Sequence, residues 1–168
     1  MFNAIVAVDN NWGIGYNGQL LEKLSADMKY FKQRTSGENI AVIMGRKTWD
    51  SLPKKPLPNR RNIIVTRHPD SEIDNQVLQG DISQILFDVV NTHYYNSLDY
   101  FVIGGGQVYK ELLPLCKYVY VTKMFVDHEN VDTYFPNLDE DKNWECVYTS
   151  DVQQENDVKF QFCVYRRV

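Results

Sequence analysis

The sequence has few cysteines and no long apolar run, and both scarcities narrow the class of protein. Its three cysteines, Cys116, Cys146 and Cys163, are far apart and have no neighbouring cysteine or histidine at zinc-ligand spacing. We therefore expect buried free thiols rather than a disulfide framework or a metal site. No apolar stretch approaches the length that crosses a membrane, and the N-terminus lacks the pattern of a secretory signal. We expect a cytoplasmic protein with no membrane partner.

An excess of either charge is also missing. The chain has 18 Lys and Arg against 22 Asp and Glu, a formal net charge of -4. This balance gives no attraction to nucleic acid, although a small anionic ligand could occupy a local basic pocket. The 168 residues contain no repeat, low-complexity tract or linker and are enough for one core. We predict one domain, residues 1–168, which is a monomer and binds small molecules.

Short apolar or alternating runs predict strands, and helical patterns lie between several of them. The predicted strands are 3–8, 40–44, 62–66, 100–103, 118–124 and 158–165, and the predicted helices are 25–35, 47–52, 82–90 and 107–113. This alternation is typical of an α/β fold with a largely parallel sheet. The last run follows the polar stretch 153–157 and reads as half of a C-terminal antiparallel hairpin, which makes the sheet mixed.

A carboxylate falls within the apolar stripe of the first predicted helix. Leu24, Asp27, Met28 and Phe31 are spaced by three and four residues and so share one face. An ionised Asp27 there loses hydration worth several kcal/mol unless a ligand or a cationic partner replaces it. The alternative is a structural carboxylate in the first turn, favoured by the helix dipole and preceded by Ser25 as N-cap.

Two strand ends run into glycine and then into a predicted helix. The first reads Gly45-Arg46-Lys47-Thr48, and the second reads Gly104-Gly105-Gly106-Gln107. Glycine allows close backbone approach, and the free N–H groups of a helix start favour phosphate, so two such ends could hold one pyrophosphate. Tight turns without a ligand are the other interpretation.

A further glycine-rich segment, residues 13–18, matches G-x-G-x-x-G but neither follows a strand directly nor opens a helix. We interpret it as a flexible loop rather than a dinucleotide-binding turn. Basic residues follow two strand ends, with Arg46 and Lys47 after one and Arg67 and His68 after the next. If the ligand is a dinucleotide, they favour NADPH over NADH; otherwise they are solvated surface charge.

Taken together, these segments resemble the dihydrofolate reductase family over nearly the whole chain. The matching landmarks are Ile5 and Ala7, 13–15, Asp27 with Phe31, 44–49, 56–60, 103–106 with Tyr109, Thr122, and 132–136. The resemblance implies a single-domain, mixed, mainly parallel eight-stranded sheet flanked by about four helices, with an antiparallel C-terminal hairpin. It also implies NADPH-dependent reduction of 7,8-dihydrofolate to 5,6,7,8-tetrahydrofolate, and antifolate inhibitors as ligands.

The resemblance assigns roles to individual residues. Asp27 would be the catalytic residue, hydrogen-bonded to the pterin and supported by Thr122, while water delivers the proton. Arg60 would bind the glutamate carboxylate, and the other substrate-binding residues would be Ile5, Met28, Phe31 and Leu57. The cofactor-binding residues would be Ala7, Ile14, Gly45, Arg46, Lys47, Thr48, Thr66, Arg67, Ile103, Gly104, Gly105, Gly106, Gln107, Val108 and Tyr109. A cis peptide is expected between Gly104 and Gly105.

The match departs in the stretch before the first predicted helix and at Ser25, where the family commonly has proline. The family commonly has Leu-Pro-Trp where this chain reads Leu20-Leu21-Glu22, so a carboxylate replaces the tryptophan that shelters the pterin. The charge of Glu22 is expected to favour protonated Asp27 if it enters the pocket. Two other functions stay open: a related reductase, such as that of riboflavin synthesis, against which Asp27, Phe31 and Arg60 argue, and a non-catalytic NADPH-binding module.

Overall fold

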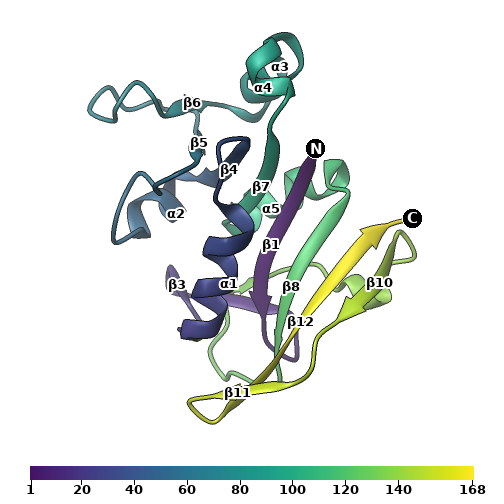
Figure 1. Ribbon diagram of the computed structural model, residues 1–168. Helices are drawn as coiled ribbons and strands as arrows, with labels where there is room; N and C mark the ends of the chain where they lie inside the picture. Colours follow the sequence, from purple (N-terminus) through teal and green to yellow (C-terminus); the bar gives the residue numbers. More distant parts are fainter.

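A mixed β-sheet forms the centre of the computed structural model, which describes residues 1–168. Eight strands form a continuous path in the order β10-β12-β8-β1-β7-β4-β5-β6, and the short β11 pairs with β12 as a ninth strand. The path therefore has the predicted eight strands (Figure 1). The strands are β1 (Phe2–Val8), β4 (Ile40–Gly45), β5 (Arg61–Val65), β6 (Leu78–Gly80), β7 (Asp99–Gly104), β8 (Tyr118–Met124), β10 (Trp144–Thr149), β11 (Gln153–Glu155) and β12 (Val158–Arg167).

The inner strands are parallel and the C-terminal strands antiparallel. β1 pairs in parallel with β7 and β8, and β4 with β5 and β7, whereas β12 runs antiparallel to β8, β10 and β11. Asn156 and Asp157 turn β11 into β12 at φ 51° and 63°, a left-handed conformation that Asn and Asp tolerate. The mixed sheet and the C-terminal hairpin are confirmed.

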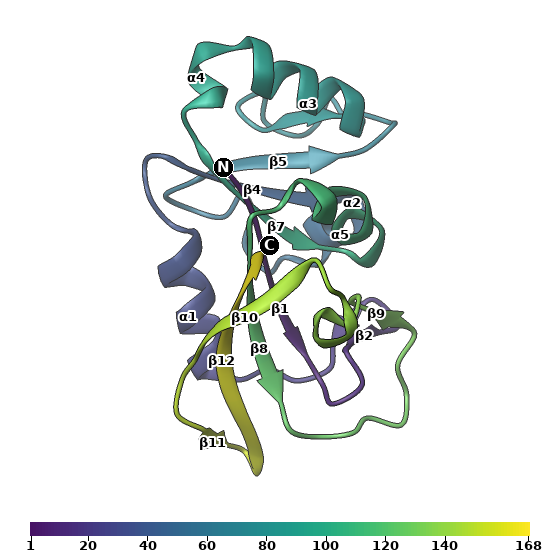
Figure 2. The same ribbon diagram turned by 90° about the vertical axis from the view of Figure 1, so that its right-hand side faces the viewer.

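Helices cover both faces of the sheet, which explains why its inner strands are apolar on both sides. The helices are α1 (Ser25–Thr35), α2 (Arg46–Ser51), α3 (Ile82–Asn91), α4 (His93–Asn96) and α5 (Gly106–Leu112), with single 3-10 turns at Leu113–Leu115 and Leu138–Glu140. α1 and α5 lie on opposite faces (Figure 2). The four predicted helices are present, and none of the helices has the length and apolarity to cross a membrane.

Alternate residues of β1 enter different parts of the core. Ala4, Val6 and Val8 join the cluster that contains side chains of α3 and α5, whereas Ile5 joins the cluster against which Phe31 of α1 packs. This is the period of two expected for a strand covered on both faces. β1 therefore fixes the relative positions of the helices that surround the candidate site.

The segment 13–18 differs from its predicted state. It forms β2 (Gly13–Tyr16), which pairs with β3 (Gln19–Leu20) and with β9 (Thr133–Tyr134) in a separate three-stranded sheet. Asn17 and Gly18 make the turn at φ 52° and 76°. The flexible-loop interpretation was wrong: β3 is too short to give a sequence signal, and the other partner, β9, lies more than a hundred residues away.

The cysteines follow their prediction in part. All three are free thiols, and Cys116 and Cys163 are buried. Cys146, however, is exposed on β10, whose residues after Trp144 face solvent. Burial of all three was therefore an incorrect expectation.

Candidate functional site

The carboxyl ends of β1, β4, β5 and β7 gather at one edge of the sheet, because these strands run parallel. In open α/β sheets, ligands bind at this edge, next to the point where the strand order reverses. Here the chain passes from β1 outward to β4, β5 and β6 and then returns to place β7 between β1 and β4. The predicted site residues approach this edge from the strand ends, from α1 and from α5.

Asp27 is held beside the sheet by a side chain of β8. The Thr122 hydroxyl donates a 2.6 Å hydrogen bond to Asp27 Oδ1, and Thr122 pairs in register with Ala7 of β1. Thr122 is 1% exposed, so its hydroxyl is aimed by the packed sheet, whereas Asp27 is half-buried. Asp27 Oδ2 has no hydrogen-bond partner within the protein and is not enclosed. One oxygen of this carboxylate is therefore fixed and the other is available to a ligand.

Burial raises the pKa of the Asp27 carboxyl, and the bond from Thr122 opposes that rise. Burial and, secondarily, the charge of Asp27 raise the pKa of Tyr109. The Tyr109 hydroxyl stays protonated and donates a 2.7 Å hydrogen bond to the Ile5 carbonyl of β1. This bond fixes α5 against β1.

The first turn of α1 is capped from another part of the chain. Leu24 is the N-cap and makes no side-chain cap, so the expected Ser25 N-cap was wrong. Instead Glu155 of β11 accepts hydrogen bonds from the N–H groups of Ser25 at 2.6 Å and Ala26 at 3.1 Å, and from the Ser25 hydroxyl at 2.8 Å. Those bonds lower the pKa of Glu155. Because Glu155 satisfies the helix start, Asp27 is not needed as the cap.

Most predicted pocket-lining residues belong to one apolar cluster. Ile5 is a member of this cluster, and Phe31, Leu57 and Ile103 pack against it. Met28 does not take part, because its side chain is 62% exposed. Of the expected stripe, Phe31 packs against this cluster and Leu24 is buried in another one, whereas Met28 is exposed and its role in binding substrate stays a prediction.

Arg60 is fixed next to the end of α1. Its guanidinium donates hydrogen bonds of 2.8 Å to the Thr35 hydroxyl and 2.8 Å to the Pro58 carbonyl. Thr35 in turn donates to the Phe31 carbonyl at 2.7 Å. Burial lowers the pKa of Arg60, but a guanidinium remains protonated at physiological pH. The cation is therefore oriented for an anionic ligand.

The side chain of the buried Asn62 shapes the turn that carries Arg60. Asn62 Oδ1 accepts from the Leu57 N–H at 2.9 Å, and its amide donates to the Leu57 carbonyl at 2.9 Å and the Arg60 carbonyl at 3.3 Å. Asn59, between them, has φ 60°. This network sets the direction in which the Arg60 side chain leaves the turn.

The two glycine junctions lie next to each other, because β4 and β7 are neighbours. A Cβ on Gly45 would lie 3.2 Å from Val108 Cγ2 and 3.8 Å from the Gly105 nitrogen. The Gly104-Gly105 peptide is cis, and Gly104 has φ 131°. A Cβ on Gly105 would lie 3.6 Å from Thr48 Oγ1. No side chain caps α2 or α5, so their first N–H groups face this junction unpaired by side chains.

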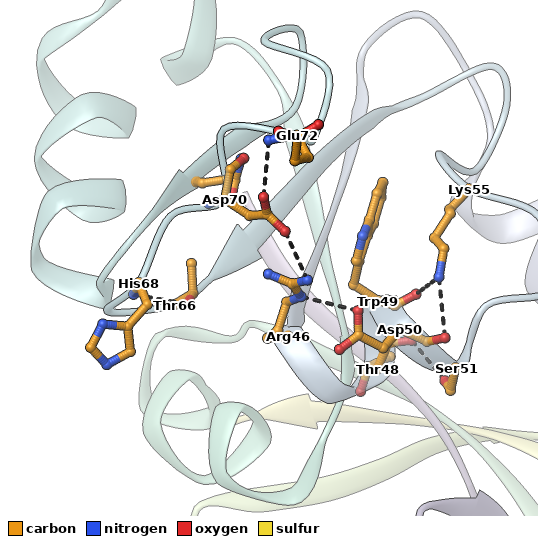
Figure 3. A network of polar contacts seen from close by, with 11 residues as sticks. Arg46, Thr48, Trp49, Asp50, Ser51, Lys55, Thr66, His68, Asp70 and Glu72 are labelled. Carbon is orange, nitrogen blue, oxygen red and sulfur yellow. Dashed lines mark hydrogen bonds and ion pairs between the residues drawn. The ribbon is translucent and has the colours of Figure 1, made fainter.

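Arg46 at the start of α2 is held by two carboxylates (Figure 3). Its Nε lies 3.0 Å from Asp50 Oδ1, and its Nη2 lies 3.0 Å from Asp70 Oδ2 in the segment after β5. Asp70 also accepts a hydrogen bond from the Glu72 N–H at 2.9 Å. That bond, and to a smaller extent the bond and charge of Arg46, lower the pKa of Asp70. Arg46 is thus positioned by the protein, but its charge is shared with two acids.

A cavity of about 570 Å³ lies between the end of β5 and the starts of α3 and α5. It brings together Thr66 and Arg67 with Gln107 and Val108, all predicted for the cofactor, and Asp81 and Glu111 also line it. Arg46 does not line this cavity. Lys47 is exposed on α2, and Ile14 is buried in the cluster that contains Val108 and Tyr109. Gly106 contacts β9, where a Cβ would lie 2.7 Å from Thr133 Cγ2.

Glu22 pairs with a histidine from the connection between β8 and β9. Its Oε1 lies 3.0 Å from His128 Nε2, and His128 Nδ1 lies 3.1 Å from Asp9 Oδ2. The raised pKa of Asp27 comes from burial and not from the charge of Glu22. The condition under which Glu22 was expected to favour protonated Asp27, entry into the pocket, is therefore not met.

Several residues that shape the site escaped the sequence reasoning: Asp9, Thr35, Asn62, Asp70, His128 and Glu155. Buried polar residues within apolar surroundings, such as Thr35 and Asn62, are detectable in principle by the criterion used for Asp27. The rest depend on long-range contacts. No group of three or more His, Cys, Asp or Glu side chains is arranged to hold a metal ion.

Comparisons with known proteins agree on one family. The family described as Dihydrofolate reductase matches residues 1–167. The chain is 37% identical to the dihydrofolate reductase of Bacillus subtilis (strain 168), over 99% of this chain and 95% of that protein, and 37% identical to that of Schistosoma mansoni, over 97% and 94%. It is also 38% identical to the bifunctional dihydrofolate reductase-thymidylate synthase of Daucus carota, but it spans only 34% of that protein's length.

Proposed function

The chain belongs to the dihydrofolate reductase family, and we propose that it reduces 7,8-dihydrofolate to 5,6,7,8-tetrahydrofolate with NADPH. The observation that carries the proposal is the Asp27 carboxylate, which has one oxygen fixed by Thr122 at 2.6 Å and the other free of protein partners. This arrangement presents an acceptor to the N–H groups of an amino-pyrimidine edge. Charge-assisted hydrogen bonds of this kind contribute about 1.5–3 kcal/mol each.

The surroundings of Asp27 suit a flat, partly apolar substrate with an anionic tail. Ile5, Phe31 and Leu57 supply an apolar wall on one side, as members or neighbours of one cluster. Arg60 supplies the cation at the far end of α1, fixed by Thr35. A ring on Asp27 and a carboxylate on Arg60 would therefore be held at the two ends of the same helix.

Features of this chain fit a dinucleotide at the adjoining strand ends. The Gly45 and Gly105 junctions lie side by side, and Thr66 and Arg67 line the neighbouring cavity. Residues 104–106 and Thr48 would lie along the pyrophosphate, and Arg46 would share its charge between Asp70 and a ribose phosphate. When bound, the nicotinamide cofactor supplies the hydride, as cofactors do in such enzymes.

The contribution of the protein to the chemistry is position and electrostatics. Asp27 holds the pterin in one tautomer and raises the basicity of its ring nitrogen, and water delivers the proton. The ligand would contact the carboxylate oxygen that has no partner in the protein, because Thr122 bonds only the other one. The same site would accept antifolates that present an amino-pyrimidine edge.

Dihydrofolate-dependent oxidation of NADPH tests the proposal. We expect turnover with NADPH that exceeds turnover with NADH at equal concentrations, and competition by a diaminopyrimidine antifolate. Absence of turnover with tight NADPH binding would instead favour a non-catalytic cofactor-binding module. Reduction of an amino-pyrimidine ribitol phosphate, but not of dihydrofolate, would identify the reductase type of riboflavin synthesis.

A further inference from the structure

His128 bridges two carboxylates from segments that are far apart in the sequence. It lies in the connection between β8 and β9, with Nδ1 3.1 Å from Asp9 Oδ2 and Nε2 3.0 Å from Glu22 Oε1. Asp9 follows β1, and Glu22 lies in the connection from β3 to α1. The bridge therefore joins the central sheet to the segment that leads into the helix carrying Asp27.

Two carboxylate partners require a doubly protonated imidazole. A neutral imidazole donates from one nitrogen only, so its other nitrogen would present a lone pair to a carboxylate oxygen. The imidazolium donates from both. Burial alone would lower the pKa of His128, but the bonds to Glu22 and Asp9 outweigh it and raise the pKa above its ordinary value of 6.5. The complete bridge is thus the low-pH form.

The contact with Glu22 is the one that a neutral His128 gives up. The Asp9 side chain is 1% exposed, and its Oδ1 already accepts from the N–H groups of Asn11 at 2.9 Å and Gly13 at 2.8 Å. The Glu22 side chain is 30% exposed and has no other ion pair, so water can replace His128 there. Because a buried carboxylate has the greater need of a donor, the proton leaves from Nε2.

No other charged group replaces the bridge. Asp127 and Glu129 flank His128 on its own connection, and both are acidic; Asp127 accepts from the Asn11 side chain at 3.3 Å. No Lys or Arg pairs with Asp9 or Glu22. A cavity of about 430 Å³ lies between the β2–β3 hairpin and this connection, lined by Tyr16 and Leu20 on one side and His128 on the other. Apolar packing is therefore sparse where the bridge lies.

We propose that His128 is a positioning residue for the proposed reduction: by holding Glu22 it fixes residues 20–24, the entry to α1 and to Asp27, and it releases them when it loses its Nε2 proton. The catalytic consequence of this proposal rests on the proposed function. The contact between His128 and Glu22 rests on geometry alone. At the position where the family commonly has tryptophan, this chain thus replaces ring packing by a titratable contact.

Tryptic cleavage after the exposed Lys23, relative to cleavage after the exposed Lys142, tests the contact in the free protein. The ratio corrects for the pH dependence of trypsin. In the wild type we expect it to rise about two- to tenfold as the pH increases from about 6.5 to about 9, the range for a partly exposed charge-assisted bond. Glu22→Ala should keep the ratio high throughout. Glu22→Gln, which can donate or accept, should make it independent of pH.

Controls separate this contact from general effects of pH. His93→Gln removes a histidine on α4, away from the bridge, and should retain the wild-type rise. A wild-type ratio that does not change with pH, or a rise that persists in Glu22→Gln, would overturn the proposal. His128→Gln should give a flat ratio if it folds, and the Glu22 variants decide the question if it does not.

The catalytic consequence has its own readout. In the wild type, kcat/KM for dihydrofolate should carry an alkaline limb that Glu22→Gln removes and His93→Gln retains. If neither the wild type nor Glu22→Gln reduces dihydrofolate, the proposed function fails, but the cleavage ratio still tests the bridge. A pH-dependent ratio with identical kcat/KM profiles in wild type and Glu22→Gln would refute the positioning role.

Discussion

Asp27→Asn separates a ligand-binding carboxylate from a structural one. Asparagine keeps the shape of the side chain and can still accept the bond from Thr122, but it places an N–H₂ group or a neutral oxygen where the free Asp27 Oδ2 lies. Two charge-assisted bonds to the pterin would be lost, each worth about 1.5–3 kcal/mol. The expected reduction in kcat/KM for dihydrofolate near neutral pH is therefore about 10²- to 10⁴-fold.

The same substitution should not weaken the free protein. Burial raises the pKa of Asp27, so the folded state prefers the neutral form. The ionised carboxylate then lowers the free energy of unfolding once the pH rises through its folded pKa. Asp27→Asn removes that loss, and we expect the variant to be as stable as the wild type, or more so, at neutral pH. A site residue that costs stability is common where function requires a buried charge.

Three measurements on one preparation decide the matter: steady-state kinetics, NADPH affinity by calorimetry, and urea unfolding. Asp88→Asn is the matched control, because Asp88 is a helical carboxylate on α3 that pairs with the Gln84 side chain and lies outside the site. The reasoning is refuted if Asp27→Asn weakens NADPH binding as much as it slows reduction, or if it unfolds at a lower urea concentration than the wild type.

Further substitutions test the supporting contacts. Thr122→Val removes the donor to the Asp27 carboxylate, so the pKa of that carboxyl should rise further and kcat/KM should fall about tenfold, which a pH-rate profile would show. Thr35→Val releases Arg60 and should raise KM about three- to tenfold for dihydrofolate, but not for a pterin without the glutamate. Asp70→Asn frees Arg46 from one acid and should lower KM for NADPH about two- to fivefold while leaving KM for NADH unchanged.

Residue patterns within a few positions of one another predicted the longer helices and the buried strands of the central sheet. The bounds of α1, Ser25–Thr35, match the prediction, although the group that caps its first turn is not local. The buried strands matched because sheets covered on both faces need continuous apolar runs. Met28 failed for a related reason: spacing gives the face of a helix but not how far the core extends along it, and Met28 is exposed.

Long-range polar contacts left no such signal. Glu155 caps α1 from 130 positions away, and His128 meets Glu22 from 106 positions away. Each of these residues is an ordinary polar residue in its own segment, and only the arrangement of strands brings them together. The sequence therefore indicated an unusual carboxylate, which we propose binds the ligand, but it could not indicate which groups hold that carboxylate and its helix in place.

Asp27 and His128 have raised pKa values and ordinary pKa values below 7, so both make the free energy of unfolding fall as the pH rises towards neutrality and above. The contribution of His128 is fully present below its ordinary pKa of 6.5 and is lost as the pH rises through its higher folded value. Ionisation of Asp27 likewise lowers the free energy of unfolding as the pH rises. Asp132 and Glu155 have lowered pKa values, so the stability they add is lost only as the pH falls below the ordinary carboxyl range.

These opposing ranges place the stability maximum on the acidic side of neutrality. Between the ordinary pKa of each of these two groups and its raised folded value, the folded protein binds more protons than the unfolded chain, so the free energy of unfolding should decline as the pH rises through neutrality. Urea unfolding at a series of pH values measures the slope. The double variant Asp27→Asn, Glu22→Gln should make this slope shallower. It removes the Asp27 carboxyl and leaves His128 with Asp9 as its one carboxylate partner. A wild-type free energy that is constant or rises over this interval would show that the bridge to His128 is not formed in solution.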